Sequence, residues 1–252
     1  NLRFICAAEI FSEGFRDYVV KKTSVYNLYK DFFHVYGSAD LGTMAVEMPV
    51  CILIKRLALK NEDLFADLFG HAEKMLTLAQ YNPLFTNFED IGGELVLTGD
   101  NVVPLIRYAI GDRGGTFTFE EAKKKLNKYG INLKKEAKLA GISDCLFHLP
   151  FVFVYERVDL STTIYGLNIY PQVIKEALLH ESLEELLTGK FTMFTKFDDS
   201  NNQYLEINLD LKKCVNPDWI SEITKVNILI RIVGHLLRWR EPRYAHPQQQ
   251  DR

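Results

Sequence analysis

Short strand-like segments, most of them followed by glycine or proline, recur through the sequence up to residue 155. They lie at 4–8, 33–36, 75–81, 94–98 and 105–110. Short runs rich in apolar residues and bounded by turn residues are typical of β-strands. The most apolar segment, LPFVFVY at 149–155, is predicted to be a strand of the core. We therefore expect a β-rich body that also carries helices.

Helices are predicted where capping residues precede a periodic segment. Ser12 is a plausible N-cap for a helix that ends at Lys22. Asn61 and Gly70 bracket another. Thr118 and Glu121 have the spacing of a capping box, and Gly130 ends the helix that follows. Lysines lie along and just after this segment, which we interpret as a solvated face rather than a binding patch; they are at positions 123, 124, 125, 128 and 134.

The pattern changes after residue 158. A strand is predicted at 162–170, a helix from Pro171, and two strands at 191–197 and 204–211 joined by DDSNNQ. A last helix is predicted over 217–238. This β-α-β-β-α order indicates a small, ferredoxin-like α+β domain. The predicted fold class is thus α/β and α+β, with a large domain over 1–157 and a small one over 158–252.

Composition restricts the function classes. The 252 residues are 47% hydrophobic, and 30 basic against 33 acidic residues give a net charge of −3. We expect no nucleic-acid partner and, without an apolar stretch of about 18 residues, no membrane span. Four cysteines lie far apart, which favours reduced thiols in a cytoplasmic protein. The first residues have no signal-peptide pattern and open in a strand, so we expect part of a longer chain.

The stretch PLIRYAIGDRGG at 104–115 allows two interpretations. A strand that runs into Gly111-Asp112 is ordinary turn chemistry, because glycine tolerates positive φ and aspartate bonds its own backbone. The same carboxylate could instead stand at the mouth of a site. Taken alone, the stretch favours the ordinary turn.

Neighbouring motifs change that balance. In chain order they are HVYGSADLG at 34–42, GGELVLTG at 92–99 after YNP at 81–83, IRYAIGDRG at 106–114, and ERVDLSTTIYGLNIYPQVIKEAL at 156–178. The succession resembles the adenylate-forming superfamily, specifically its phenylacetate–CoA ligase-like branch. The resemblance implies the end of a large nucleotide-binding domain, followed by a small mobile domain. It also implies ATP-dependent activation of a small carboxylic acid to an acyl-adenylate. Transfer to a thiol follows, with coenzyme A as the default.

The resemblance assigns one group of residues to the nucleotide. Tyr36 would stack on adenine, and Gly37 would let the backbone approach it. Ser38 would bond a phosphate or acyl oxygen. Asp40 stands where the family usually has glutamate and would help to hold Mg²⁺, directly or through a water. Their alternative roles are a half-buried tyrosine at a strand end and an aspartate that caps a turn.

A second group would complete the site. The Asp112 carboxylate would accept both ribose hydroxyls, with Gly111 giving clearance, and Arg157 would reach ribose or phosphate. Glu9 would lie beside the adenine, or else at the surface. Asp159 would be the hinge between the domains, and Gly166 would admit the pantetheine arm of coenzyme A. Arg107 is expected to pair locally, and Asn168 and Pro171 to serve the turn and helix start.

Departures from the family pattern keep other functions open. Asp40 replaces glutamate, Glu156 replaces the glycine before the hinge arginine, and no lysine follows Lys225. The family's phosphate loop would lie before residue 1, so residues 1–252 are not expected to turn over alone. The alternatives are a nucleotide-binding relative that has lost adenylation and an α+β interaction module. We also allow for a homodimer.

Overall fold

The computed structural model of the chain forms two compact units, residues 1–156 and 157–252. Their boundary falls one residue before the one expected from the sequence. The structure describes residues 2–8, 10–70, 75–100, 104–155, 162–165, 167–198, 201–213 and 215–216, with isolated positions between 220 and 233. Each unit is described by itself.

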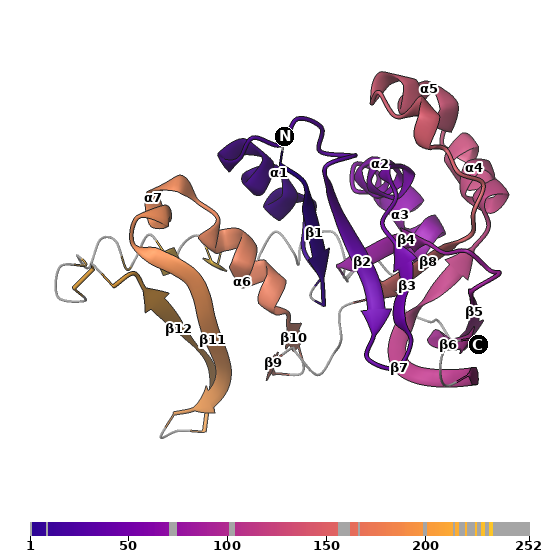
Figure 1. The fold of residues 1–252 in the computed structure, drawn as a ribbon. Coiled ribbons are helices and arrows are strands. Elements are labelled where there is room, and N and C mark those ends of the chain that lie inside the picture. Colours follow the sequence, from indigo (N-terminus) through magenta and orange to yellow (C-terminus); the bar gives the residue numbers. More distant parts are fainter. Residues whose placement is uncertain are drawn as a thin grey trace, which may run out of the picture. The chain divides into compact units, whose positions relative to one another are not determined.

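The first unit is built on a sheet whose strand order is β1-β2-β3-β4-β8-β7-β6-β5 (Figure 1). Its strands are β1 (Phe4–Ala7), β2 (Phe32–Ser38), β3 (Gly42–Val46), β4 (Leu76–Gln80), β5 (Thr86–Ile91), β6 (Glu94–Gly99), β7 (Leu105–Phe117) and β8 (Phe151–Tyr155). The β1–β2 pair is parallel, and the other neighbouring pairs are antiparallel. The mixed α/β class expected from the sequence is therefore present.

Helices connect these strands. They are α1 (Glu13–Lys22), α2 (Pro49–Ala58), α3 (Glu62–Phe69), α4 (Phe119–Lys128), α5 (Leu133–Leu139) and the short η1 (Ser143–Cys145). Of these, α1, α3, α4 and α5 each begin after a residue whose side chain caps them. Ser12 and Asn61 cap α1 and α3, and Thr118 and Glu121 form the predicted capping box of α4. The sequence did not predict α2, although Pro49 opens it and most of its residues are buried.

Two cores cover opposite faces of the central strands. One joins α2, α3, α4 and α5 to the sheet and includes Phe151 and Phe153. The other lies toward β5 and β6 and includes Val152 and Val154. Successive side chains of a strand point to opposite faces. The uninterrupted apolar run of β8 therefore follows from its burial on both sides.

Strand β7 changes its pairing partner along its length, and two glycines make this change possible. It pairs with β6 as far as Arg113 and with β8 from Gly114 onward. A Cβ on Gly114 would lie 1.9 Å from the Phe153 carbonyl oxygen, and one on Gly115 2.7 Å from the Phe153 ring. The Gly114-Gly115 pair thus allows β7 to approach β8 closely.

The second unit is also mixed α and β. It contains β9 (Thr162–Ile164), β10 (Leu167–Ile169), α6 (Pro171–Leu178), α7 (Glu181–Glu184), β11 (Leu187–Phe197) and β12 (Gln203–Leu211). A small apolar cluster of this unit includes Ile174, Leu183 and Ile228. The strand expected over 162–170 is wrong, because the chain turns at Tyr165 and forms the β9–β10 hairpin.

The ferredoxin-like layout is likewise not what the described residues show. In them, β9–β10 and β11–β12 form two separate two-stranded sheets instead of one shared sheet. The predicted helix after Pro171 is divided into α6 and α7, because His180 caps the second. Most of the helix predicted over 217–238 lies outside the described residues.

Candidate functional site

Two of the sequence motifs meet through a tyrosine and an aspartate. The Tyr36 hydroxyl, on β2, donates a hydrogen bond of 2.7 Å to Asp112 Oδ2 on β7. Tyr36 lies opposite Ala45 of β3, and its ring stacks on Phe88 of β5 with centroids 6.0 Å apart. The structure thereby brings together the YGSAD and IRYAIGD segments, 76 positions apart in the chain.

Tyr36 is too deeply buried for its ring to present a free face for stacking. The residue is only 8% exposed. Burial, together with the negative charge and hydrogen bond of Asp112, raises the pKa of the Tyr36 phenol well above its ordinary value. The hydroxyl thus stays protonated and keeps donating to the carboxylate. Adenine stacking on Tyr36 remains a prediction, and in this structure the ring packs in the core.

A second tyrosine–aspartate contact lies between the same two segments. The Tyr108 hydroxyl is 3.4 Å from Asp40 Oδ2, which is a long hydrogen bond. Asp40 stands in the turn between β2 and β3, where Ser38 Oγ accepts a hydrogen bond from the Leu41 backbone. Ser38 is thus a turn-capping residue here, and Asp40 faces β7 from the same turn.

Two glycines of the motifs have structural reasons for being glycine. A Cβ on Gly37 would lie 2.5 Å from the Gly42 carbonyl oxygen, within an irregular part of the β2–β3 pairing. Gly111 has φ of +85° with open space around its missing Cβ. Its conformation thus requires glycine, and Asp112 follows directly.

Arg107 forms local contacts, as the sequence suggests. Its Nε lies 3.2 Å from Glu89 Oε2 on β5; the Arg107 side chain is largely exposed, and that of Glu89 is partly buried. Its backbone has φ of +51°, and its N–H donates to Thr98 Oγ1 at 3.0 Å. This left-handed residue coincides with the irregular β6–β7 pairing, so its local role is to shape the bulge before Tyr108.

Several predicted site residues lie outside the described residues. These are Glu9, Arg157, the hinge residue Asp159 and Gly166. Asn168 belongs to β10 by its backbone, and Pro171 begins α6. The ribose contact of Arg157 and the pantetheine passage at Gly166 remain predictions.

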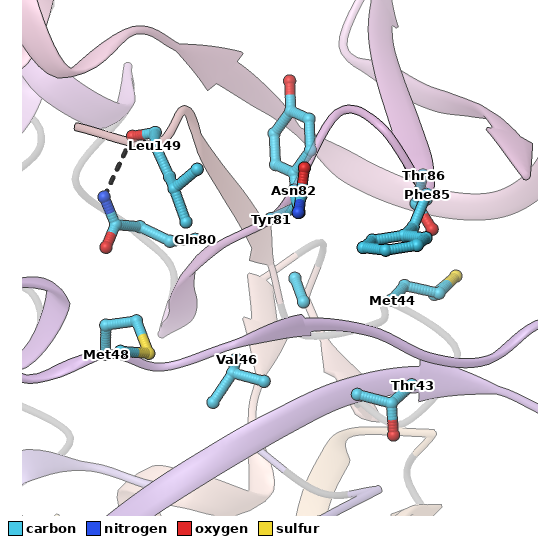
Figure 2. A pocket seen from close by; sticks show the side chains of 11 residues that line it. Thr43, Met44, Val46, Met48, Gln80, Tyr81, Asn82, Phe85, Thr86 and Leu149 are labelled. Carbon is cyan, nitrogen blue, oxygen red and sulfur yellow. Dashed lines mark hydrogen bonds between the residues drawn. The ribbon is translucent and has the colours of Figure 1, made fainter. Parts of the chain in front are cut away.

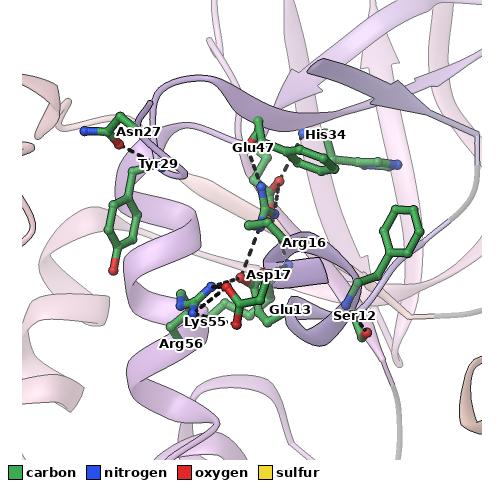
Figure 3. Close-up of polar contacts among 12 residues, drawn as sticks. Ser12, Glu13, Arg16, Asp17, Asn27, Tyr29, His34, Glu47, Lys55 and Arg56 are labelled. Carbon is green, nitrogen blue, oxygen red and sulfur yellow. Dashed lines mark hydrogen bonds and ion pairs between the residues drawn. The ribbon is translucent and has the colours of Figure 1, made fainter. Parts of the chain in front are cut away.

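A buried ionic network was missed by the sequence analysis (Figure 3). Arg16, on α1, is fully buried and lies between two carboxylates, 3.1 Å from Glu13 and 2.7 Å from Glu47. Lys55, on α2, lies 2.8 Å from Glu13 and 3.0 Å from Glu47. Glu47 also accepts the backbone N–H of His34 at 3.0 Å. The network ties both helices to β2.

The charges in this network control one another. Burial alone would raise the pKa of Glu13, but Lys55, Arg16 and Arg56 outweigh it and lower that pKa to about 2. The aromatic rings of Phe11 and Phe32 also flank the Arg16 guanidinium, at 5.0 and 5.1 Å. The sequence signal was a lysine inside the apolar run of α2, which no neighbouring acidic residue in that helix explains.

A pocket opens where β3 and β4 diverge (Figure 2). Its volume is about 330 Å³. The lining residues are Thr43, Met44, Ala45, Val46, Met48, Gln80, Tyr81, Asn82, Phe85, Thr86 and Leu149. The ring of Phe88, between Tyr36 and Tyr81, connects the wall of this pocket to the Tyr36–Asp112 pair. None of these lining residues is predicted from the sequence to belong to a site.

Two kinds of feature are absent from the part of the chain that the structure describes. No three histidine, cysteine, aspartate or glutamate side chains there converge into a group able to hold a metal ion. Nor does any helix there have the length and apolar character needed to cross a membrane. One carboxylate such as Asp40 would still suit a Mg²⁺ ion held mainly by waters and substrate phosphates.

Comparisons with known proteins give little further information. No family model matches the chain. The chain is 37% identical over 81 residues to the mitochondrial cytochrome b translational activator protein CBS1 of Saccharomyces cerevisiae. That match covers 31% of this chain and 35% of the yeast protein. The chain therefore spans about a third of this curated relative, which does not show a family.

Proposed function

We propose that the full-length protein binds ATP and activates a small carboxylic acid as its adenylate, for transfer to a thiol such as coenzyme A, and that the first unit of this chain holds the nucleotide. The observation that carries this proposal is the 2.7 Å contact of Tyr36 with Asp112. It joins two segments that the resemblance assigns to the same nucleotide.

Asp112 has the chemistry that a ribose requires. A carboxylate can accept several hydrogen bonds, and Tyr36 uses only Oδ2. Among the described residues, no hydrogen bond to Asp112 Oδ1 is found. Ribose hydroxyls can donate to that oxygen, and such bonds to a charged acceptor are stronger than neutral ones. The Tyr36 hydroxyl holds the carboxylate in place for them.

Asp40 and Tyr108 would stand beside this sugar. Asp40 is a second carboxylate between the same two segments, 3.4 Å from the Tyr108 hydroxyl. In the proposed complex it would bind Mg²⁺ through a water, because the ion prefers oxygen ligands and keeps part of its water shell. The ion would neutralise phosphate charge when bound.

Asp40 in place of glutamate, Glu156 in place of glycine and the lack of a lysine after Lys225 favour a second candidate, a nucleotide-binding relative without catalysis. The Tyr36 ring is 8% exposed and stacks on Phe88, so it offers adenine no open face in this structure. A protein that only senses a nucleotide would still need Asp112 to bind the ribose, but it would not need to bind or activate an acid. The two candidates share the binding step and differ in the chemical step.

Titration calorimetry with ATP and Mg²⁺ tests the shared step. We expect Asp112→Ala to weaken ATP binding by about tenfold to a hundredfold, because a hydrogen bond to a charged group contributes about 1.5–3 kcal/mol. The matched control is Asp100→Ala, at an exposed aspartate outside the motifs. Equal ATP affinity of wild type and Asp112→Ala would contradict the proposal.

Pyrophosphate exchange separates the two candidates. Acid-dependent exchange of labelled pyrophosphate into ATP by the full-length protein would support catalysis. ATP binding without exchange across a panel of acids would favour the non-catalytic candidate.

A further inference from the structure

The pocket between β3 and β4 has a wholly uncharged lining. None of its eleven lining residues is Asp, Glu, Lys, Arg or His. Most of the wall is apolar, with two methionines, a valine, a leucine and a phenylalanine. A phosphate or carboxylate placed there would lose its hydration without gaining a counter-charge. The chemistry of the pocket therefore differs from that of the Tyr36–Asp112 pair.

Gln80 gives the pocket one oriented polar group. Its Nε2 donates to the carbonyl oxygens of Phe147 and Leu149, at 2.8 and 2.9 Å. Because two carbonyl oxygens can only be met by the amide nitrogen, the orientation of the amide is fixed. Gln80 is 3% exposed, and its Oε1 has no hydrogen-bond partner.

An unpartnered buried acceptor of this kind is costly. Leaving such a group without a hydrogen bond costs about 1–3 kcal/mol. Figure 2 shows the oxygen on the side of the amide away from Leu149, toward Met48. Met48 has a flexible, unbranched side chain, which can move aside for a ligand atom. A donor that enters from the pocket would satisfy Oε1.

We propose that this pocket binds an uncharged aromatic molecule that carries one N–H or O–H donor, and that Gln80 Oε1 accepts that donor. A volume of about 330 Å³ lies at the lower end of small-molecule sites. Phe85 stands at the entrance, because it lines the pocket and is 72% exposed. The site is independent of the proposed ATP chemistry, since Asp40 and Asp112 do not line it.

Indole and 1-methylindole are matched probes for this proposal. They present the same ring system, but only indole has an N–H donor. We expect residues 1–252 to bind indole at least tenfold more tightly than 1-methylindole in ligand-observed NMR or calorimetric titration. Equal affinities would show that Gln80 does not accept the donor. If neither probe binds at millimolar concentration, the proposal that this pocket binds an aromatic molecule is wrong.

Adjacent exposed residues provide matched variants that spare the core. Phe85→Ala removes part of the pocket wall and should weaken both indoles about threefold to tenfold, since a truncated aromatic wall loses apolar contact area. Leu84→Ala is the control, because Leu84 is 85% exposed and is not part of the lining. Equal indole affinities of Phe85→Ala and Leu84→Ala would contradict the placement of the indole site in this pocket.

Discussion

The first unit contains two polar clusters that differ in how completely their charges are paired. In the ionic network of Glu13, Arg16, Glu47 and Lys55, each carboxylate contacts two or more cations, and all four residues are buried. The Asp112 carboxylate receives one tyrosine hydroxyl and is half-buried.

This difference separates a stabilising role from a binding role. A buried charge without its partner is strongly destabilising, so each member of the ionic network is needed by the others. Among the described residues, no hydrogen bond reaches the second oxygen of the Asp112 carboxylate, beside the fixed Tyr36 donor. We therefore assign the ionic network to stability, and we propose a recognition role for the Tyr36–Asp112 pair.

The largest effect is expected from removing the central cation of the network. Arg16→Met leaves Glu13 and Glu47 with fewer partners in a buried setting. We expect the free energy of unfolding to fall by about 3–5 kcal/mol in urea titrations followed by circular dichroism. The control is Lys123→Met, whose partner Glu120 is exposed, and which should cost about 1 kcal/mol or less. Equal losses of unfolding free energy in the two variants would contradict the distinction between the buried network and a surface ion pair.

Acid should weaken the network through Glu13. Its pKa is about 2 in the folded protein and 4.5 ordinarily. A lowered pKa contributes stability above pH 4.5 that is lost as pH falls toward 2. At about 1.4 kcal/mol per pH unit, the loss is about 3 kcal/mol. Glu13→Gln should be less stable than wild type at pH 7, and its stability should vary less between pH 5 and 2. Parallel pH profiles of the two proteins would contradict this.

The strand that presents Asp112 should depend on Gly114 more than on Gly111. A Cβ at Gly114 meets backbone at 1.9 Å, whereas one at Gly111 meets nothing within 4 Å. We expect Gly114→Ala to cost about 3 kcal/mol or more, beyond ordinary overpacking. Gly111→Ala should cost about 1–2 kcal/mol, the strain of a left-handed backbone. Hydrogen exchange of β8 amides would show the difference, and equal protection would contradict the account.

The smallest expected effect is on stability at the Tyr36–Asp112 pair. Tyr36→Phe removes one hydrogen bond and keeps the ring, so the free energy of unfolding should fall by about 0.5–1.5 kcal/mol. Thermal unfolding of this variant beside wild type measures it. A loss as large as that of Arg16→Met would mean that both clusters are structural.

The sequence predicted local features of the fold better than distant ones. The caps at Ser12, Asn61 and Thr118 were predictable because each bonds the first turn of its own helix. Two strands, β3 and β5, were not predicted, because their segments are short and lack a clear apolar alternation. The hairpin at Tyr165 was missed because a non-glycine residue with φ of +46° makes the turn.

For the candidate site, the sequence could predict which residues take part but not how they contact one another. The motif order drew attention to Tyr36 and Asp112, but only the folded chain shows that they contact each other. The ionic network escaped prediction because its members come from separate segments that meet only after folding. The pocket could not be predicted, since it forms where β3 and β4, paired at Val46 and Gln80, diverge.

The most direct test of the central claim is a comparison of ATP with 2′,3′-dideoxy-ATP on wild type and Asp112→Ala. If Asp112 accepts the ribose hydroxyls, wild type should bind ATP at least tenfold more tightly than the dideoxy nucleotide. The variant should bind the two nucleotides equally. A preference for ATP that survives in Asp112→Ala, or its absence in wild type, would contradict the assignment of Asp112 to the ribose.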